Sequence, residues 1–296
     1  MTDHIFFCYC DIINLTMEVL NMKLKFLGTA AAEGFPSLYC KCDACVEAIN
    51  NGGRNIRTRA QALLDDKVLI DFGPDTYHHM ITYNVPTDKI HHVLITHSHA
   101  DHFYKNDLIY RRKGYASKVE EEPLYVHATN RAYNKVVEMI NEEQMGQYLQ
   151  AHEVVAYEPF DILNYHIYPL KANHSEYSNP VIYLISDGSK TMLYAHDTGV
   201  FYEKVWEELS KLEKPLDLIT LDCTAGILKG WRDGHLSFDT FLEMINKMRE
   251  LKIIDENTKV IANHFSHNGL ATYDKMAEVA AAYNVIVSYD GMEVEF

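Results

Sequence analysis

The chain has 296 residues, of which 47% are hydrophobic, and this ordinary globular composition is sufficient to bury a sizeable core. It carries 27 Lys and Arg against 42 Asp and Glu, and the net charge of -15 argues against non-specific binding to nucleic acid. No run of about 18 apolar residues occurs, so the sequence predicts no membrane-spanning helix.

The first 21 residues form an apolar segment without the basic start and small-residue cleavage site of a signal peptide. A second methionine, Met22, stands directly before the first strand-like run. We therefore expect an N-terminal appendage over residues 1–21 and a single domain over residues 22–296. Six cysteines without an export signal indicate a reducing, cytoplasmic location, where thiols serve as metal ligands more often than as disulfides.

Strand-like and helix-like segments alternate along the domain. The predicted strands are Lys23–Leu27, Ala60–Leu64, Lys67–Asp71, His92–Ile95, Val181–Ile185, Thr191–Ala195, Leu216–Leu221, Lys259–Ala262, Val285–Val287 and Met292–Phe296. The predicted helices are Asp75–Tyr83, Asn130–Asn141, Tyr202–Lys211, Phe238–Leu251 and Tyr273–Tyr283. This alternation without an obvious linker predicts one α/β domain. The segment Asn106–His152, rich in Tyr and Glu, reads as an insertion, and both a lid and a homodimer contact stay open for it.

The stretch THSHADH follows directly after the strand His92–Ile95 and places three histidines and one aspartate within six positions. Such a density of imidazoles is costly in a core unless each ring nitrogen has a partner. Ligand-type residues also stand beside later strands, namely His174, Asp197 and His264. Because several strand ends each supply one such residue, we expect them to meet at one edge of a sheet.

The number of these residues is sufficient for two metal ions. The first ion would take His97, His99 and His174; the second would take Asp101, His102 and His264; Asp197 would lie between them. Three protein ligands around an ion leave room for water, which is typical of a catalytic site, and water between two such ions is a nucleophile at neutral pH. We also expect Asp101 to act in catalysis. Nitrogen and oxygen ligands of this kind favour zinc, manganese or iron(II) over calcium.

This ordered series resembles the HxHxDH…H…D…H signature of the metallo-β-lactamase superfamily, and the resemblance runs from about Lys23 to the C-terminus. It implies a four-layer αβ/βα sandwich with a binuclear metal site along one edge. It also implies that Asp71, in LIDFG, orients a metal-bound imidazole from behind. Asp222, at the end of the strand Leu216–Leu221, is a second candidate for such a supporting role.

A narrower resemblance involves the segment FLGTAAAEGFPSLYCKCDACVEA, which is similar to the phosphodiesterases of the carbon–phosphorus lyase pathway (PhnP type). It implies a structural zinc held by three cysteines and one histidine, here Cys40, Cys42, Cys45 and His267. Reduced thiols are the alternative. The same resemblance implies that His235, ahead of a late helix, protonates the leaving group.

Three arginines, Arg54, Arg57 and Arg59, interrupt the acidic chain and are candidates for binding a substrate phosphate; a solvated loop is the alternative. The sequence thus predicts a binuclear metal-dependent phosphodiesterase with two catalytic divalent ions, zinc or manganese, and one structural zinc. Its substrate would be a small, even cyclic, phosphodiester, attacked by a metal-bridging hydroxide, and we expect neither a membrane nor a nucleic-acid partner. A tRNA 3′-processing endonuclease, a lactonase, a thioesterase and a non-catalytic metal-binding protein of cofactor biosynthesis are the alternatives.

Overall fold

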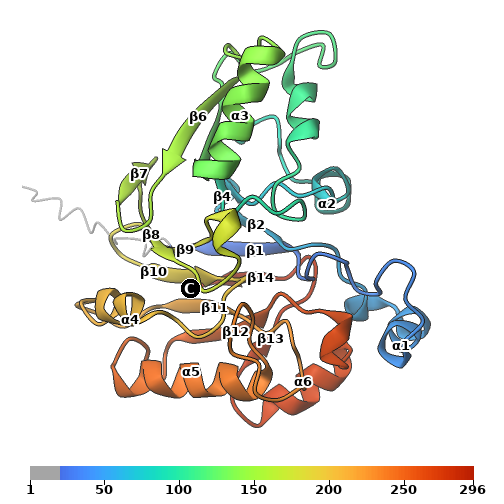
Figure 1. Ribbon diagram of the computed structural model, residues 1–296, viewed down its shortest axis with the longest axis vertical. Coiled ribbons are helices and arrows are strands. Elements are labelled where there is room, and N and C mark those ends of the chain that lie inside the picture. Colours follow the sequence, from blue (N-terminus) through green and yellow to red (C-terminus); the bar gives the residue numbers. More distant parts are fainter. Residues whose placement is uncertain (1–20) are drawn as a thin grey trace, which may run out of the picture.

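Two mixed β-sheets pack face to face in the computed structural model, which describes residues 21–296, and helices cover both outer faces (Figure 1). The predicted appendage over residues 1–21 therefore lies, except for Asn21, outside the described residues. No helix in the described chain is long and apolar enough to cross a membrane.

The first sheet combines strands from the N-terminal half with the last strand of the chain. Its strands are β1 (Lys23–Gly28), β2 (Gln61–Leu64), β3 (Val68–Ile70), β4 (His92–Ile95), β5 (Leu124–Thr129), β6 (Leu149–Val154) and β14 (Glu293–Glu295). They lie in the order β14-β1-β2-β3-β4-β5-β6. The pairs from β3 to β6 are parallel, and those from β14 to β3 are antiparallel.

The second sheet comes from the C-terminal half. Its strands are β7 (Phe160–Ile162), β8 (Tyr165–Lys171), β9 (Val181–Ser186), β10 (Thr191–Ala195), β11 (Leu218–Asp222), β12 (Lys259–Asn263) and β13 (Ile286–Val287). They lie in the order β13-β12-β11-β10-β9-β8-β7, parallel from β10 to β13 and antiparallel from β7 to β10.

The α-helices other than α1 separate into two groups, one on each side of the paired sheets, and α1 lies apart from both groups (Figure 1). The α-helices are α1 (Asp43–Asn51), α2 (Thr76–Tyr83), α3 (Asn130–Glu142), α4 (Glu203–Leu209), α5 (Phe238–Glu250) and α6 (Tyr273–Ala281). The short 3-10 helices are η1 (Gly53–Asn55), η2 (Lys105–Arg111), η3 (Glu176–Ser178) and η4 (His267–Gly269). Helices α2 and α3 cover the first sheet, and α4, α5 and α6 cover the second, which confirms the four-layer αβ/βα sandwich.

Strand β4 shows why its apolar run is continuous and does not alternate with polar residues. Leu94 is buried between the two sheets, whereas Val93 and Ile95 are buried against the helices on the outer face. A strand buried on both faces needs apolar side chains at every position. Each such side chain contributes about 1.5–3 kcal/mol when fully buried.

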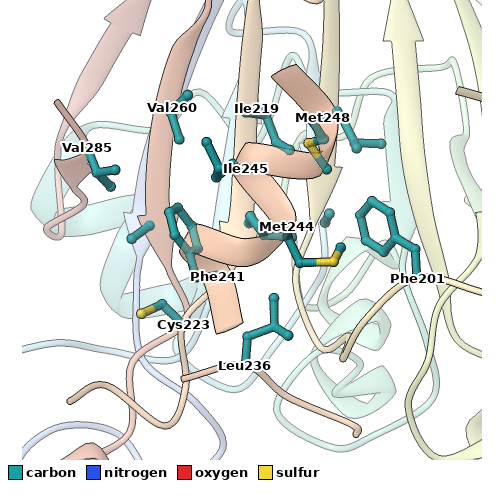
Figure 2. Close-up of a cluster of buried hydrophobic side chains, with 14 of the residues drawn as sticks. Phe201, Ile219, Cys223, Leu236, Phe241, Met244, Ile245, Met248, Val260 and Val285 are labelled. Atoms are coloured by element: carbon teal, nitrogen blue, oxygen red, sulfur yellow. The ribbon is translucent and has the colours of Figure 1, made fainter. Parts of the chain in front are cut away.

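Helix α5 places its apolar stripe on the second sheet (Figure 2). Phe241, Met244, Ile245 and Met248 recur at helical spacing and are buried with side chains of β11 and β12. Ser237 begins the helix through a capping box with Thr240, which satisfies free N–H groups of the first turn. The capping box therefore fixes the end of the loop that precedes α5.

The predicted elements are confirmed with ends that differ by at most two residues, but the sequence reasoning missed α1 and the strands β5, β6, β7 and β8. The interpretation of Asn106–His152 as an insertion is wrong, because this segment supplies β5, α3 and β6 and completes the first sheet. In β5 and β6, His and Tyr interrupt the apolar pattern, and this obscured the strands.

Buried His79 connects α2 to the first sheet, with Nδ1 2.6 Å from Oε1 of Gln61 and Nε2 2.7 Å from Oγ1 of Thr58. Burial lowers the pKa of His79 from 6.5 to about 4. Below about pH 6.5 the side chain is therefore protonated in the unfolded chain but stays neutral in the folded chain. The free energy of unfolding decreases as the pH falls from about 6.5 to about 4.

We predict that His79→Gln removes roughly 3 kcal/mol of this acid sensitivity, measured as the change in unfolding free energy between neutral pH and about pH 4 in urea titrations. The matched control is His78→Gln, because His78 is the exposed neighbour on the same helix. Equal acid sensitivity in the wild type and in His79→Gln would contradict the prediction.

Candidate metal centre

The predicted ligands lie at strand ends along one edge of the two sheets. THSHADH follows β4, Asp197 follows β10 and His264 follows β12. Asp71, Asp197 and His264 all have positive φ values, of 68°, 49° and 65°. Such a backbone is uncommon for residues other than glycine and is typical of functional sites. Here the left-handed turn lies at the point where each chain segment leaves its strand.

One group of ligand atoms belongs to His97, His99 and His174, and these atoms lie within 4.8 Å of one another. His97 Nε2 is 2.8 Å and His174 Nε2 is 3.3 Å from His99 Nδ1. Burial and the neighbouring His102 hold the pKa of His97 well below its usual value. A neutral imidazole is the form that binds a metal.

A second group consists of Asp101, His102, Asp197 and His264, whose ligand atoms again lie within 4.8 Å of one another. Oδ2 of Asp197 is 2.6 Å from His102 Nε2 and 3.0 Å from His264 Nε2. Oδ1 of the same carboxylate lies 3.7 Å from Nε2 of His174 in the first group. The Asp197 carboxylate therefore stands between the two groups.

The donor atoms of the second group fit a divalent cation. His102 Nε2, His264 Nε2 and Asp197 Oδ2 are buried and converge within 2.6–3.0 Å, yet the ring N–H directions are not aligned for hydrogen bonds between them, so none of the three has a hydrogen-bond partner. Buried polar atoms without partners are rare, because each costs about 1–3 kcal/mol. A cation at their meeting point would satisfy all three, so the residues present fit a bound metal.

Polar groups behind the ligands fix the imidazole rings. Asp71 Oδ2 lies 2.6 Å from His102 Nδ1, and Asp71 also accepts hydrogen bonds from the backbone N–H and hydroxyl of Thr96. Thr224 Oγ1 lies 2.8 Å from His264 Nδ1. The sequence analysis named Asp71 but missed Thr96 and Thr224. Thr96 directly precedes His97, and Thr224 lies two positions after Asp222.

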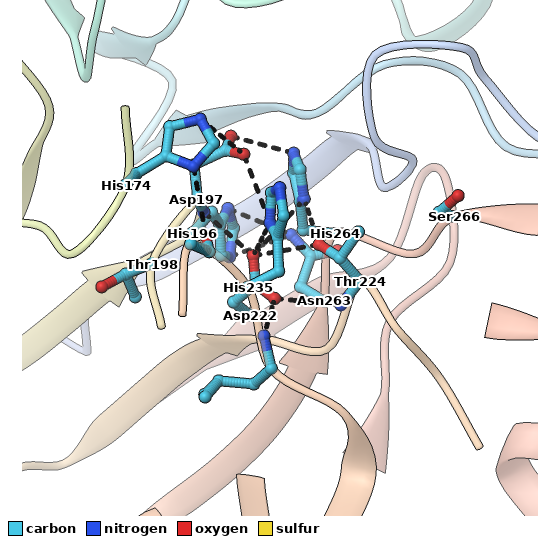
Figure 3. Close-up of polar contacts among 12 residues, drawn as sticks. His174, His196, Asp197, Thr198, Asp222, Thr224, His235, Asn263, His264 and Ser266 are labelled. Carbon is cyan, nitrogen blue, oxygen red and sulfur yellow. Dashed lines mark hydrogen bonds and ion pairs between the residues drawn. The ribbon is translucent and has the colours of Figure 1, made fainter. Parts of the chain in front are cut away.

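Asp222 and His235 lie beside the ligands (Figure 3). Asp222 Oδ2 accepts a hydrogen bond from the backbone N–H of Asp197 and lies 3.1 Å from His235 Nδ1. His235 Nδ1 is also 3.6 Å from Asp197 Oδ1. Burial lowers the pKa of His235, but the carboxylates of Asp222 and Asp197 outweigh it and raise the pKa to about 9.

The structure also brings together Cys40, Cys42, Cys45 and His267, whose ligand atoms lie within 4.8 Å of one another. The thiol sulfurs of Cys40 and Cys42 are each 3.5 Å from His267 Nδ1. Burial raises the pKa of Cys42, but hydrogen bonds from His267 and its neighbours outweigh burial and lower the pKa to about 6. Three sulfurs and one imidazole nitrogen are a donor set for tetrahedral zinc.

The three arginines proposed to bind a substrate phosphate have other environments. Arg54 lies over the rings of Tyr289 and Tyr273, and Arg59 forms an ion pair with Asp75. Arg57 is buried, donates to Thr29 Oγ1 and the carbonyl of Ser288, and stacks on Phe265. The structure does not bring them to the metal centre, because none of them lines the pocket beside it.

That pocket has a volume of about 360 Å³ and opens over the ligand groups. Its lining includes the ligands His99, Asp101, His174, Asp197 and His264, together with His235. Glu33, Leu228, Trp231, Ser266 and Asn268 also line it, and the sequence analysis assigned none of these five a role. A cavity of this size admits a small molecule.

An αβ/βα sandwich with two adjoining His/Asp groups at one edge defines a metal-dependent hydrolase of the metallo-β-lactamase type. The chain belongs to the β-lactamase superfamily, because residues 66–265 match the family model described as the β-lactamase superfamily domain. No curated protein matches the sequence.

Solved structures share the fold at low sequence identity. A diphosphatase of the PhnP family has a TM-score of 0.71 and 19% identity, with 94% of this chain and 98% of that chain covered. Zn²⁺-bound PqqB from Methylobacterium extorquens has a TM-score of 0.71 and 18% identity, covering 93% and 100%. The short form of human tRNase Z has a TM-score of 0.60 and 16% identity, covering 92% and 98%.

We predict that Asp71→Asn weakens metal binding by about 10- to 100-fold, because the amide no longer supplies the charge that holds His102. Metal retention against a graded series of chelator concentrations measures the change. Asp187→Asn is the control, since the side chain of Asp187 bonds within its own turn. Unchanged metal retention in Asp71→Asn would show that Asp71 does not support metal binding through His102.

We predict that Cys42→Ser lowers the zinc content by one ion per chain and leaves the metals of the His/Asp groups in place. A hydroxyl is a much weaker zinc ligand than a thiolate. Elemental analysis of the purified variant measures the loss. Cys223→Ala is the control, because Cys223 is buried in the core away from the cluster. If zinc content does not change in Cys42→Ser, the cysteines are simply reduced thiols.

Proposed function

We propose that this protein is a binuclear metal-dependent phosphodiesterase that acts on small phosphodiesters. The observation that carries the proposal is the position of His235, which lines the metal-side pocket with its Nδ1 held 3.1 Å from Asp222. Within the described chain, Nε2 of the same ring has no hydrogen-bond partner. The imidazole is thus oriented by one nitrogen and presents the other to a substrate.

The two His/Asp groups would hold two divalent cations, zinc or manganese, which would supply positive charge for phosphoryl oxygens and an acidified water molecule. Asp197 keeps the two groups in a fixed relation, and Asp101 adds negative charge beside His102. His235 donates the proton that the departing alkoxide needs. The cysteine cluster would hold a zinc that ties the N-terminal loop to η4 and thereby holds one side of the pocket.

Two features support a small substrate over a tRNA. The net charge of -15 opposes a polyanion, and Glu33 adds a carboxylate to the pocket wall. A diphosphate ester is the second candidate, because a structure of similar fold is described as a diphosphatase. Both substrates need neutralisation of phosphoryl oxygens and protonation of a leaving group.

The function is tested with metal-loaded protein on bis-p-nitrophenyl phosphate, alkyl phosphodiesters, diphosphate esters, lactones and thioesters. We expect turnover of the phosphodiesters. Hydrolysis of only lactones or thioesters would overturn the proposal. Bound metal without turnover of any ester would favour a non-catalytic metal-binding protein.

We predict that His235→Ala lowers kcat by at least about 100-fold for alkyl phosphodiesters, whose leaving groups need a proton. The loss is smaller for p-nitrophenyl esters, because p-nitrophenolate leaves without protonation. Metal content stays at the wild-type level. His166→Ala is the control, since His166 is exposed and pairs with Asp161 on the surface. An equal loss of activity and metal would make His235 a ligand.

A further inference from the structure

The pocket over the metal ligands is lined by two unlike sets of side chains. One set is apolar and consists of Ala225, Leu228 and Trp231 from the loop between β11 and α5. The other set is polar and consists of Glu33, Ser266 and Asn268. Neither set belongs to the metal ligands, so these side chains are available to contact the part of a substrate that lies away from the phosphorus.

Trp231 is a large aromatic side chain that lines this pocket and is 49% exposed. Its indole has no aromatic or cationic partner in residues 21–296. Its backbone, in contrast, is fixed, because its N–H donates to Ser237 Oγ and its carbonyl accepts from Ser237 N–H and Thr240 Oγ1. Ser237 and Thr240 cap α5, so the backbone that carries the indole is held rigidly.

The neighbouring backbone is anchored as well. The carbonyl of Arg232 accepts a hydrogen bond of 2.8 Å from the N–H of Val200. At Gly199 a Cβ would lie 2.3 Å from the same carbonyl oxygen, so only glycine allows this approach. His235 and Trp231 thus belong to one firmly attached loop. This loop fixes the position of the imidazole relative to the exposed indole.

In the polar set, Glu33 uses one carboxylate oxygen for contacts within the protein. Its Oε1 accepts hydrogen bonds from Ser266 Oγ and Asn268 Nδ2, and lies 3.5 Å from His267 Nε2. No protein group in the described chain bonds Oε2. An ionised carboxylate only accepts hydrogen bonds, so this free oxygen favours a hydroxyl or amino donor and opposes a further phosphate.

We infer that the pocket selects a phosphodiester whose leaving group is a flat aromatic ring bearing a hydroxyl or amino donor, with the ring on Trp231 and the donor on Glu33. This inference rests on the proposed function. Stacking on an indole is tolerant of ring identity, because it depends on apolar area and on the face of the π system. The hydrogen bond from the ring's donor to Glu33 is directional, so it fixes the orientation of the ring in the pocket.

The kinetic test compares two methyl phosphodiesters on each enzyme, one with a β-naphthyl and one with a trifluoroethyl leaving group. For Trp231→Ala we expect kcat/KM to fall about tenfold for the naphthyl ester and less than about twofold for the trifluoroethyl ester. Trp231→Phe retains most of the naphthyl activity. Leu251→Ala, an exposed apolar residue after α5, is the control. Equal losses on both esters, or none, overturn the inference.

The Glu33 contact is tested with an aminonaphthyl ester. Wild-type protein should prefer it over the unsubstituted naphthyl ester, and Glu33→Gln should lose that preference while keeping the preference for naphthyl over trifluoroethyl. The amide preserves the size of the side chain and its contact with Ser266. A preference that persists in Glu33→Gln removes Glu33 from recognition.

A binding measurement separates this inference from the function on which it rests. The chain has two tryptophans, and Trp206 is only 3% exposed, so in Trp206→Phe the emission comes from Trp231 alone. Metal-loaded Trp206→Phe is titrated with phenylphosphonate and methylphosphonate. We expect a saturable emission change with the phenyl compound and about tenfold tighter binding than for the methyl compound. If the wild type hydrolyses no phosphodiester but this preference exists, the proposed function fails and the aromatic subsite stands. Equal binding of both phosphonates overturns the subsite.

Discussion

The buried carboxylate of Asp197 is the constraint on which the site depends. One oxygen meets the imidazoles of His102 and His264, and the other faces His174. A charge that is only 4% exposed is costly unless opposite charge surrounds it. Cations in the two His/Asp groups would provide that charge and would also satisfy the buried atoms that have no hydrogen-bond partner. The left-handed turn at Asp197 places this side chain where both groups can share it.

The two sheets bring the candidate ligands together. Strands of both sheets end at one edge, so the loops after β4, β10 and β12 bring their ligands together. Behind the ligands, Asp71 and Thr224 hold imidazoles from the first and second sheets, respectively. Continuous apolar runs bury central strands such as β4 on both faces, and this close packing makes the supports stiff, as a pair of metal ions in a fixed relation would require.

Two segments connect the centre to the rest of the molecule. The loop before α5 carries both His235 and Trp231 and is fixed by the helix cap, so both side chains stand on one rigid backbone. The N-terminal loop carries the cysteines and Glu33, and Glu33 contacts η4 beside His267. The cysteine cluster is therefore linked to the pocket lining through Glu33 and η4.

The sequence alone predicted the elements with clear periodicity and the candidate ligand residues, because THSHADH, Asp197 and His264 follow recognisable strands. The resemblance to the PhnP type implied the group of Cys40, Cys42, Cys45 and His267, whose ligand atoms the structure brings within 4.8 Å of one another. The sequence analysis failed for β5 and β6, where His127 and His152 break the apolar pattern. Only the tertiary structure decided which residues form the pocket walls, because Glu33 and Trp231 lie about two hundred positions apart and carry no motif. It likewise placed Arg57 under Phe265 and away from the metal centre, since the packing around a guanidinium depends on the surrounding fold and not on its own sequence neighbours.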